Sequence, residues 1–83
     1  MRLPRSISGT ELAALLRRSY GYSVTRQTGS HMRLTSTYRG YEHHITIPRH
    51  NPLRIGTLSS ILGDVASYLE IDREQLALEL FSR

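Results

Sequence analysis

A chain of 83 residues is long enough for one hydrophobic core, so we expect residues 1–83 to form a single domain. The absence of cysteine excludes disulfides, thiolate metal sites and a cysteine nucleophile. All 11 basic residues other than histidine are arginines, and the net charge is +4. Because 5 of the 7 acidic residues lie from Asp64 onward, the positive charge is concentrated in the middle of the chain, which suits binding of a polyanion.

The first predicted helix begins at a capping box. Ser8 and Glu11 have the S-x-x-E spacing, in which each side chain satisfies a free backbone N–H. The apolar run 12–16 supplies the buried stripe, and Gly21 can end the helix. This run is the longest in the chain and falls far short of the roughly 20 apolar residues that cross a bilayer. We therefore expect a soluble, cytoplasmic protein with no membrane partner.

Three strands are predicted next, because residues 22–26, 31–37 and 42–47 alternate in polarity and are rich in Thr, Val, Ile and Tyr. A two-residue turn at 39–40 would pair Leu34 with Ile45, and Met32 with Ile47. Both pairs are apolar, so this register predicts one buried face. The opposite face then carries the polar side chains of the second and third strands, among them His31, Arg33, Thr35, Thr37, Glu42, His44 and Thr46.

The turn between the first two strands is predicted from its glycine. A three-residue loop at 27–29, with Gly29 in the left-handed conformation, would pair Val24 with Met32. It would place Thr25 beside His31 on the open face.

Two helices complete the chain. Pro48 ends the third strand, a loop runs to residue 54, and apolar residues at helical spacing predict a helix over 56–69. Asp72 and Gln75 predict the start of a short last helix that ends near Phe81. The order predicts an α+β fold, α-β-β-β-α plus a short C-terminal helix, with helices on one face of a three-stranded antiparallel sheet. A double-stranded-RNA-binding-like fold has this arrangement.

The side chains left for chemistry are histidine, threonine, serine and arginine on the open face. This set suits RNA cleavage, because RNA carries its own nucleophile in the 2′-hydroxyl. An enzyme need only remove that proton, protonate the leaving 5′-oxygen and neutralise the charge on the phosphorane. We expect no cofactor and no metal, since His43 and His44 diverge and Glu42 is the only nearby carboxylate.

His31 is the candidate catalytic residue. It follows the Gly29-Ser30 turn and shares a strand face with Arg33. The pattern alone is equally consistent with a surface histidine that happens to follow a turn. His43, on the apolar side, is expected to be a partly buried structural residue.

Further candidates for RNA contact lie on the sheet face or at the start of the second helix, where free N–H groups favour an anion. They are Arg26, Ser30, Arg33, His44, Arg49, Arg54 and Thr57. His44 is also consistent with an ordinary surface histidine. The loop that carries Arg49, His50 and Arg54 is equally consistent with a solvated basic loop.

Motifs at consistent spacing run along nearly the whole chain: Leu3-Pro4-Arg5, Ser8-Gly9-Thr10-Glu11-Leu12, Gly29-Ser30-His31, Ile47-Pro48, the segment 53–62 (L-R-I-G-T-L-S-S-I-L) and the closing segment 71–76. In these motifs the sequence resembles the HicA (YcfA-type) toxins.

This resemblance implies a double-stranded-RNA-binding-like fold and a type II toxin that is an mRNA-cleaving endoribonuclease, neutralised by a HicB antitoxin. The family's catalytic histidine, in the G-S-H motif, corresponds to His31. Many members have a second histidine or another polar residue directly after it, where this chain has Met32. The identity of any second acid–base group therefore stays open. The alternatives are a non-catalytic RNA-binding module of the same fold and a protein-interaction domain.

Overall fold

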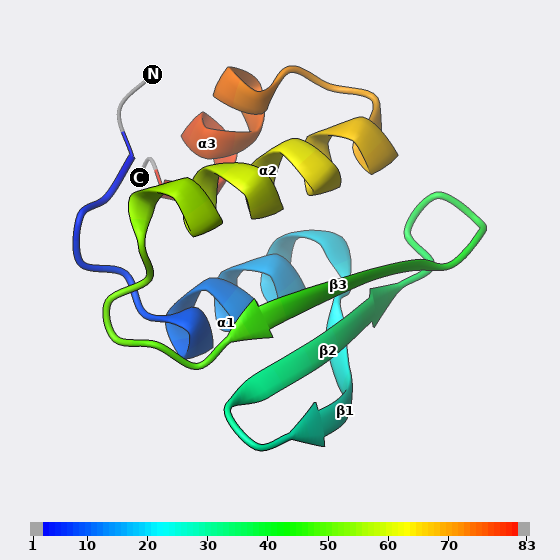
Figure 1. The fold of residues 1–83 in the computed structure, drawn as a ribbon. Helices are drawn as coiled ribbons and strands as arrows, with labels where there is room; N and C mark the ends of the chain where they lie inside the picture. The colour runs from blue at the N-terminus through cyan, green and yellow to red at the C-terminus, as the bar shows by residue number, and fades with distance from the viewer. Residues whose placement is uncertain (1–2, 82–83) are drawn as a thin grey trace.

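The computed structural model describes residues 3–81; residues 1–2 and 82–83 lie outside this range. The elements are α1 (Gly9–Tyr20), β1 (Ser23–Thr28), β2 (His31–Ser36), β3 (His43–Pro48), α2 (Ile55–Leu69) and α3 (Arg73–Phe81). The strands form an antiparallel sheet in the order β1-β2-β3. The β1 edge lies farthest from α2 and α3 (Figure 1). The predicted double-stranded-RNA-binding-like α+β fold is confirmed.

The helix α1 begins and ends at the capping residues that the sequence predicts. The Ser8 side chain accepts from the Glu11 N–H at 3.0 Å, and the Glu11 carboxylate accepts from the Ser8 N–H at 2.8 Å. Gly21 ends the helix in the left-handed conformation, with φ of 70°. The capping box and the glycine C-cap therefore have the local geometry that the sequence predicts.

The core lies between the helices and one face of the sheet. The pairs Met32–Ile47 and Leu34–Ile45 have the predicted register, and all four side chains are buried. The predicted two-residue turn is wrong, because residues 37–42 form a longer loop in which the Gly40 N–H bonds to the Thr37 carbonyl. The register survives this difference, since the buried face fixes it.

The helices cover this buried face with fully buried apolar side chains, Leu12 and Leu16 from α1 and Leu58, Leu62 and Val65 from α2. Burying one such side chain stabilises the fold by about 1.5–3 kcal/mol. Among residues 3–81, none of the helices combines the length and the hydrophobicity required to cross a membrane.

The strand β1 departs from the prediction. Thr28, rather than Thr25, lies opposite His31, so the turn has two residues, Gly29-Ser30, and not three. Val24 lies opposite Leu34, not Met32, and its side chain is 48% exposed. The predicted register is wrong because every residue of this edge strand is exposed, and without a buried face nothing in the polarity pattern fixes its pairing.

Candidate functional site

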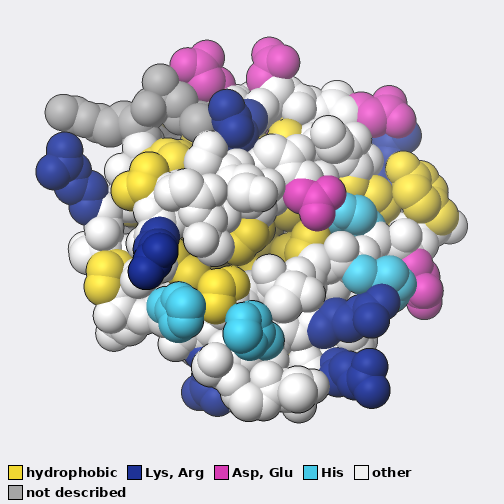
Figure 2. All heavy atoms as spheres, in the orientation of Figure 1, with side chains coloured by type: hydrophobic (Ala, Val, Ile, Leu, Met, Phe, Trp, Pro, Cys, Tyr) yellow, Lys and Arg dark blue, Asp and Glu magenta, His cyan; other side chains and the backbone are white. Residues whose placement is uncertain are grey.

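The open face of the sheet carries the candidate residues. Along β2, the exposed side chains of His31 and Arg33 alternate with the buried side chains of Met32 and Leu34. Arginine and histidine side chains gather over the strands in the lower half of Figure 2, whereas most acidic side chains in that view lie over the helices. The sheet therefore presents a positive surface to solvent.

An irregularity in β1 changes which of its side chains reach this face. The pairing shifts between Val24 and Arg26, so Thr25 is an extra residue between two ladder pairs. Such a bulge re-aims the side chains that follow it. Arg26 thus lies opposite Arg33, and both arginines line the same hollow. Plain alternation after Val24 would have turned Arg26 toward the other face.

The hollow has a volume of about 340 Å³ and is lined by Thr25, Arg26, Arg33, Thr35, Glu42 and His44. It brings together three of the predicted RNA-contacting residues: Arg26, Arg33 and His44. Two guanidinium groups in one concave surface fit the planar, two-pronged recognition of a phosphate.

Hydrogen bonds fix the side chains at one end of the hollow. The Thr25 and Thr35 hydroxyls lie 2.9 Å apart, and the Thr35 hydroxyl lies 2.8 Å from His44 Nδ1. His44 Nε2 lies 3.4 Å from the Glu42 carboxylate. Both ring nitrogens of His44 therefore have partners. The register predicted for β1 places Thr25 beside His31, and it therefore misses the contact between the Thr25 and Thr35 hydroxyls.

His31 lies on the same face but outside the hollow. It pairs with Thr28 on one side and with Pro48 on the other, and its side chain is exposed. Thr35 lies four positions further along β2, which corresponds to about 13 Å. Arg33 lies between them and is the guanidinium nearest to His31 along the strand.

The other predicted contacts are Ser30 in the turn between β1 and β2, Arg49 directly after β3, and Arg54 and Thr57 at the start of α2. The Arg49 N–H donates to the Ser30 carbonyl at 2.6 Å, so these two candidates are neighbours of His31. Arg54 is the N-cap residue of α2, which has no side-chain capping bond and no acid in its first turn. Arg54 is exposed and Thr57 is half-buried at this helix end, and neither lines the hollow.

His43 has the structural role that the sequence predicts. Its Nδ1 lies 2.7 Å from the Tyr22 hydroxyl, its Nε2 lies 3.2 Å from the Asp64 carboxylate, and its ring stacks on Tyr68. Burial raises the pKa of the Tyr22 phenol well above its usual range, so the hydroxyl stays protonated. Through His43, Asp64 and Tyr68, these contacts link β3 to α2.

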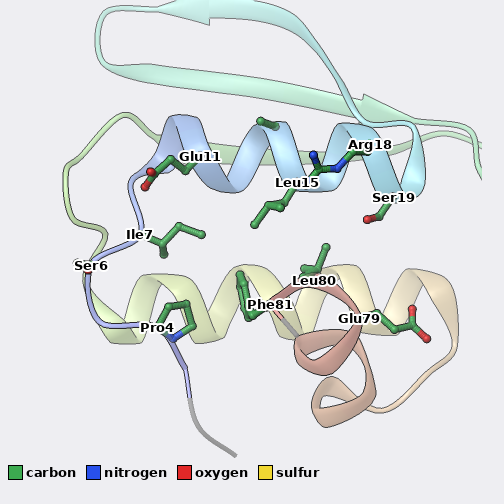
Figure 3. A pocket seen from close by; sticks show the side chains of 11 residues that line it. Pro4, Ser6, Ile7, Glu11, Leu15, Arg18, Ser19, Glu79, Leu80 and Phe81 are labelled. Atoms are coloured by element: carbon green, nitrogen blue, oxygen red, sulfur yellow. The ribbon is translucent and has the colours of Figure 1, made fainter. Parts of the chain in front are cut away.

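A larger cavity, of about 640 Å³, lies on the helical side of the molecule. The side chains of Ile7, Leu15, Leu80 and Phe81 point into the space between α1 and α3 (Figure 3). None of the candidate site residues lines this cavity. This cavity is therefore separate from the candidate site on the sheet face.

The fold and the uncovered polar face define a small α+β domain of the double-stranded-RNA-binding-like class. Comparison with protein families is more specific: residues 9–66, more than half of the chain, match the family described as HicA toxin of bacterial toxin-antitoxin systems. The chain belongs to this family, as its motifs predict. It is therefore a toxin of a toxin–antitoxin system, and an antitoxin is its partner. Neither the curated proteins nor the solved structures gave a match.

Proposed function

We propose that this toxin is a metal-independent endoribonuclease that cleaves mRNA, with His31 as a catalytic acid–base residue. The observation that carries the proposal is the exposed imidazole of His31 on a positive, uncovered sheet face, two residues from Arg33. A ribose-phosphate backbone can reach this position without any rearrangement of the core. Family membership supports the same function.

The reaction uses the substrate's own nucleophile. An imidazole takes the proton of the 2′-hydroxyl while O2′ bonds to phosphorus, and the bond from phosphorus to the 5′-oxygen breaks as that oxygen gains a proton. A guanidinium such as that of Arg33 offsets the negative charge that builds on the phosphorane. General acid–base catalysis by histidine contributes about 10²–10⁴-fold to such a rate.

The hollow binds a second phosphate of the same strand. The end of the hollow formed by Thr35 and His44 lies about 13 Å from His31 along β2, away from the cleaved bond, so His44 contributes to affinity and not to the chemical step. Arg26, opposite Arg33, adds a second guanidinium to the hollow. Ser30, Arg49, Arg54 and Thr57 extend the contact surface along the loop and the exposed start of α2. Affinity should therefore depend strongly on salt.

The antitoxin is of the HicB type and covers this same face. A protein that neutralises the toxin by contact must keep RNA away from His31, and the exposed positive surface favours an acidic partner. Binding of antitoxin and of RNA are then mutually exclusive.

The test compares the purified wild-type chain with His31→Ala on a transcript in EDTA. We expect cleavage by the wild type, and at least a 100-fold slower rate for the variant. Intact RNA from a folded wild-type protein would reject the enzyme, and RNA binding without cleavage would favour the non-catalytic module.

Growth provides an independent readout. Expressed without antitoxin, the wild type should arrest cells and His31→Ala should not. Equal growth arrest by both chains would refute the role of His31.

A further inference from the structure

The cleavage reaction needs a proton acceptor at the 2′-oxygen and a proton donor at the 5′-oxygen. His31 supplies one imidazole, and the residue after it, Met32, is buried in the core. His44 shares the open face, but about 13 Å of strand separates the two histidines, too far for both to reach one phosphodiester. The second group must lie nearer to His31.

The segment that follows β3 passes directly beside His31. Pro48 lies opposite His31, and the Arg49 N–H donates to the Ser30 carbonyl, so strand pairing continues one residue beyond β3. His50 is the next residue. Strand spacing places its α-carbon roughly 8 Å from that of His31. Two imidazoles at this separation can reach opposite oxygens of one phosphodiester.

The backbone of this segment is held firmly against α1. The Gly9 N–H donates to the His50 carbonyl at 2.9 Å. Gly9 approaches Pro48 so closely that a Cβ atom there would lie 1.9 Å from its carbonyl oxygen. The His50 side chain is nonetheless exposed. The fixed backbone holds the imidazole near His31 before RNA binds, and the exposed side chain is open to the substrate.

We propose that His50 is the second acid–base residue of the cleavage reaction, an inference that rests on the proposed ribonuclease function. One imidazole of the His31–His50 pair takes the 2′-proton as the O2′–phosphorus bond forms. The imidazolium of the other gives its proton to the 5′-oxygen as the phosphorus–O5′ bond breaks. The products are a 2′,3′-cyclic phosphate and a 5′-hydroxyl, and the two histidines have exchanged protonation states.

The experiment measures kcat, KM and the pH profile of RNA cleavage for the wild type, His31→Ala and His50→Ala. Asn51→Ala, an exposed change in the same loop, is the matched control. We expect His50→Ala to lower kcat about 10²–10⁴-fold, with Asn51→Ala close to the wild type. The bell-shaped profile should lose one limb in His31→Ala and the opposite limb in His50→Ala. Thermal unfolding of each variant checks that the fold is intact.

A second substrate identifies the acid. At the cleavage site mapped with the wild-type protein, the 5′-oxygen of an oligonucleotide is replaced by sulfur, whose thiolate leaves without protonation. Cleavage of this substrate should be restored in one of the two histidine variants and not in the other.

The outcomes separate the two proposals. A wild type that does not cleave RNA removes the proposed function. Cleavage that requires His31 but keeps a normal kcat in His50→Ala overturns the role of His50 alone. A higher KM with unchanged kcat and both limbs of the profile would make His50 a phosphate contact, and would also overturn it.

Discussion

Replacing Gly9 with alanine tests how α1 is joined to the end of β3. A Cβ atom at this position would lie 1.9 Å from the Pro48 carbonyl oxygen and 3.2 Å from an Ile47 methyl group. The nearest atom belongs to the backbone, so it cannot rotate away. Alanine must therefore push the end of β3 from α1 and weaken the 2.9 Å bond from the Gly9 N–H to His50.

The expected magnitude follows from two opposing effects. Overpacking costs about 1–3 kcal/mol, and replacing a helical glycine returns about 0.5–1 kcal/mol of backbone entropy. Taking the middle of each range, the net loss is about 1 kcal/mol, which corresponds to a fall in Tm of roughly 4–8 °C for a domain of this size. Thermal and urea unfolding followed by circular dichroism measure the change.

Gly56→Ala is the matched control. Gly56 also lies in the first turn of a helix, but a Cβ atom there would meet nothing within 4 Å. This variant should be more stable than the wild type by about 0.5–1 kcal/mol. If Gly9→Ala were as stable as Gly56→Ala, the contact between α1 and Pro48 would not have the importance assigned to it.

Three further predictions concern the cap, the tyrosines and the basic face. Ser8→Ala should lower the free energy of unfolding by about 1 kcal/mol in urea titrations, because the capping box loses its acceptor; an unchanged midpoint would contradict this. Burial raises the pKa of the Tyr20 and Tyr22 phenols above the value of about 10 in the unfolded chain. The free energy of unfolding should therefore decrease as the pH rises above about 10, and it should decrease less steeply in the Tyr22→Phe variant. Arg33→Ala should reduce the salt slope of RNA binding by about one, whereas Arg18→Ala on α1 should leave it unchanged.

The resemblance and the polarity pattern predicted much of the fold. The capping box of α1 and the glycine at its end are local signals. The pairing of β2 with β3 follows from their single buried face. Such signals can be recognised from residue order alone, because a one-residue slip would expose the whole apolar set. The outward direction of His31 follows from the same alternation.

The pairing of β1 and the makeup of the hollow could not be predicted in this way. Every residue of β1 is exposed, so its register depends on the turn and on the bulge at Thr25, and neither has a polarity signature. The position of Arg26 opposite Arg33 depends on that bulge. The hydrogen-bonded chain through Thr25, Thr35 and His44 follows from the same pairing.

The sequence by itself determined the order of elements, the buried face and the family, since these depend on spacing along the chain. The tertiary structure alone decided which distant polar residues meet: Arg26 with Arg33 across a bulge, and the segment of His50 with the turn before His31. Contacts of this kind depend on backbone packing, here the close approach of Gly9 to Pro48, which no periodicity in the sequence encodes.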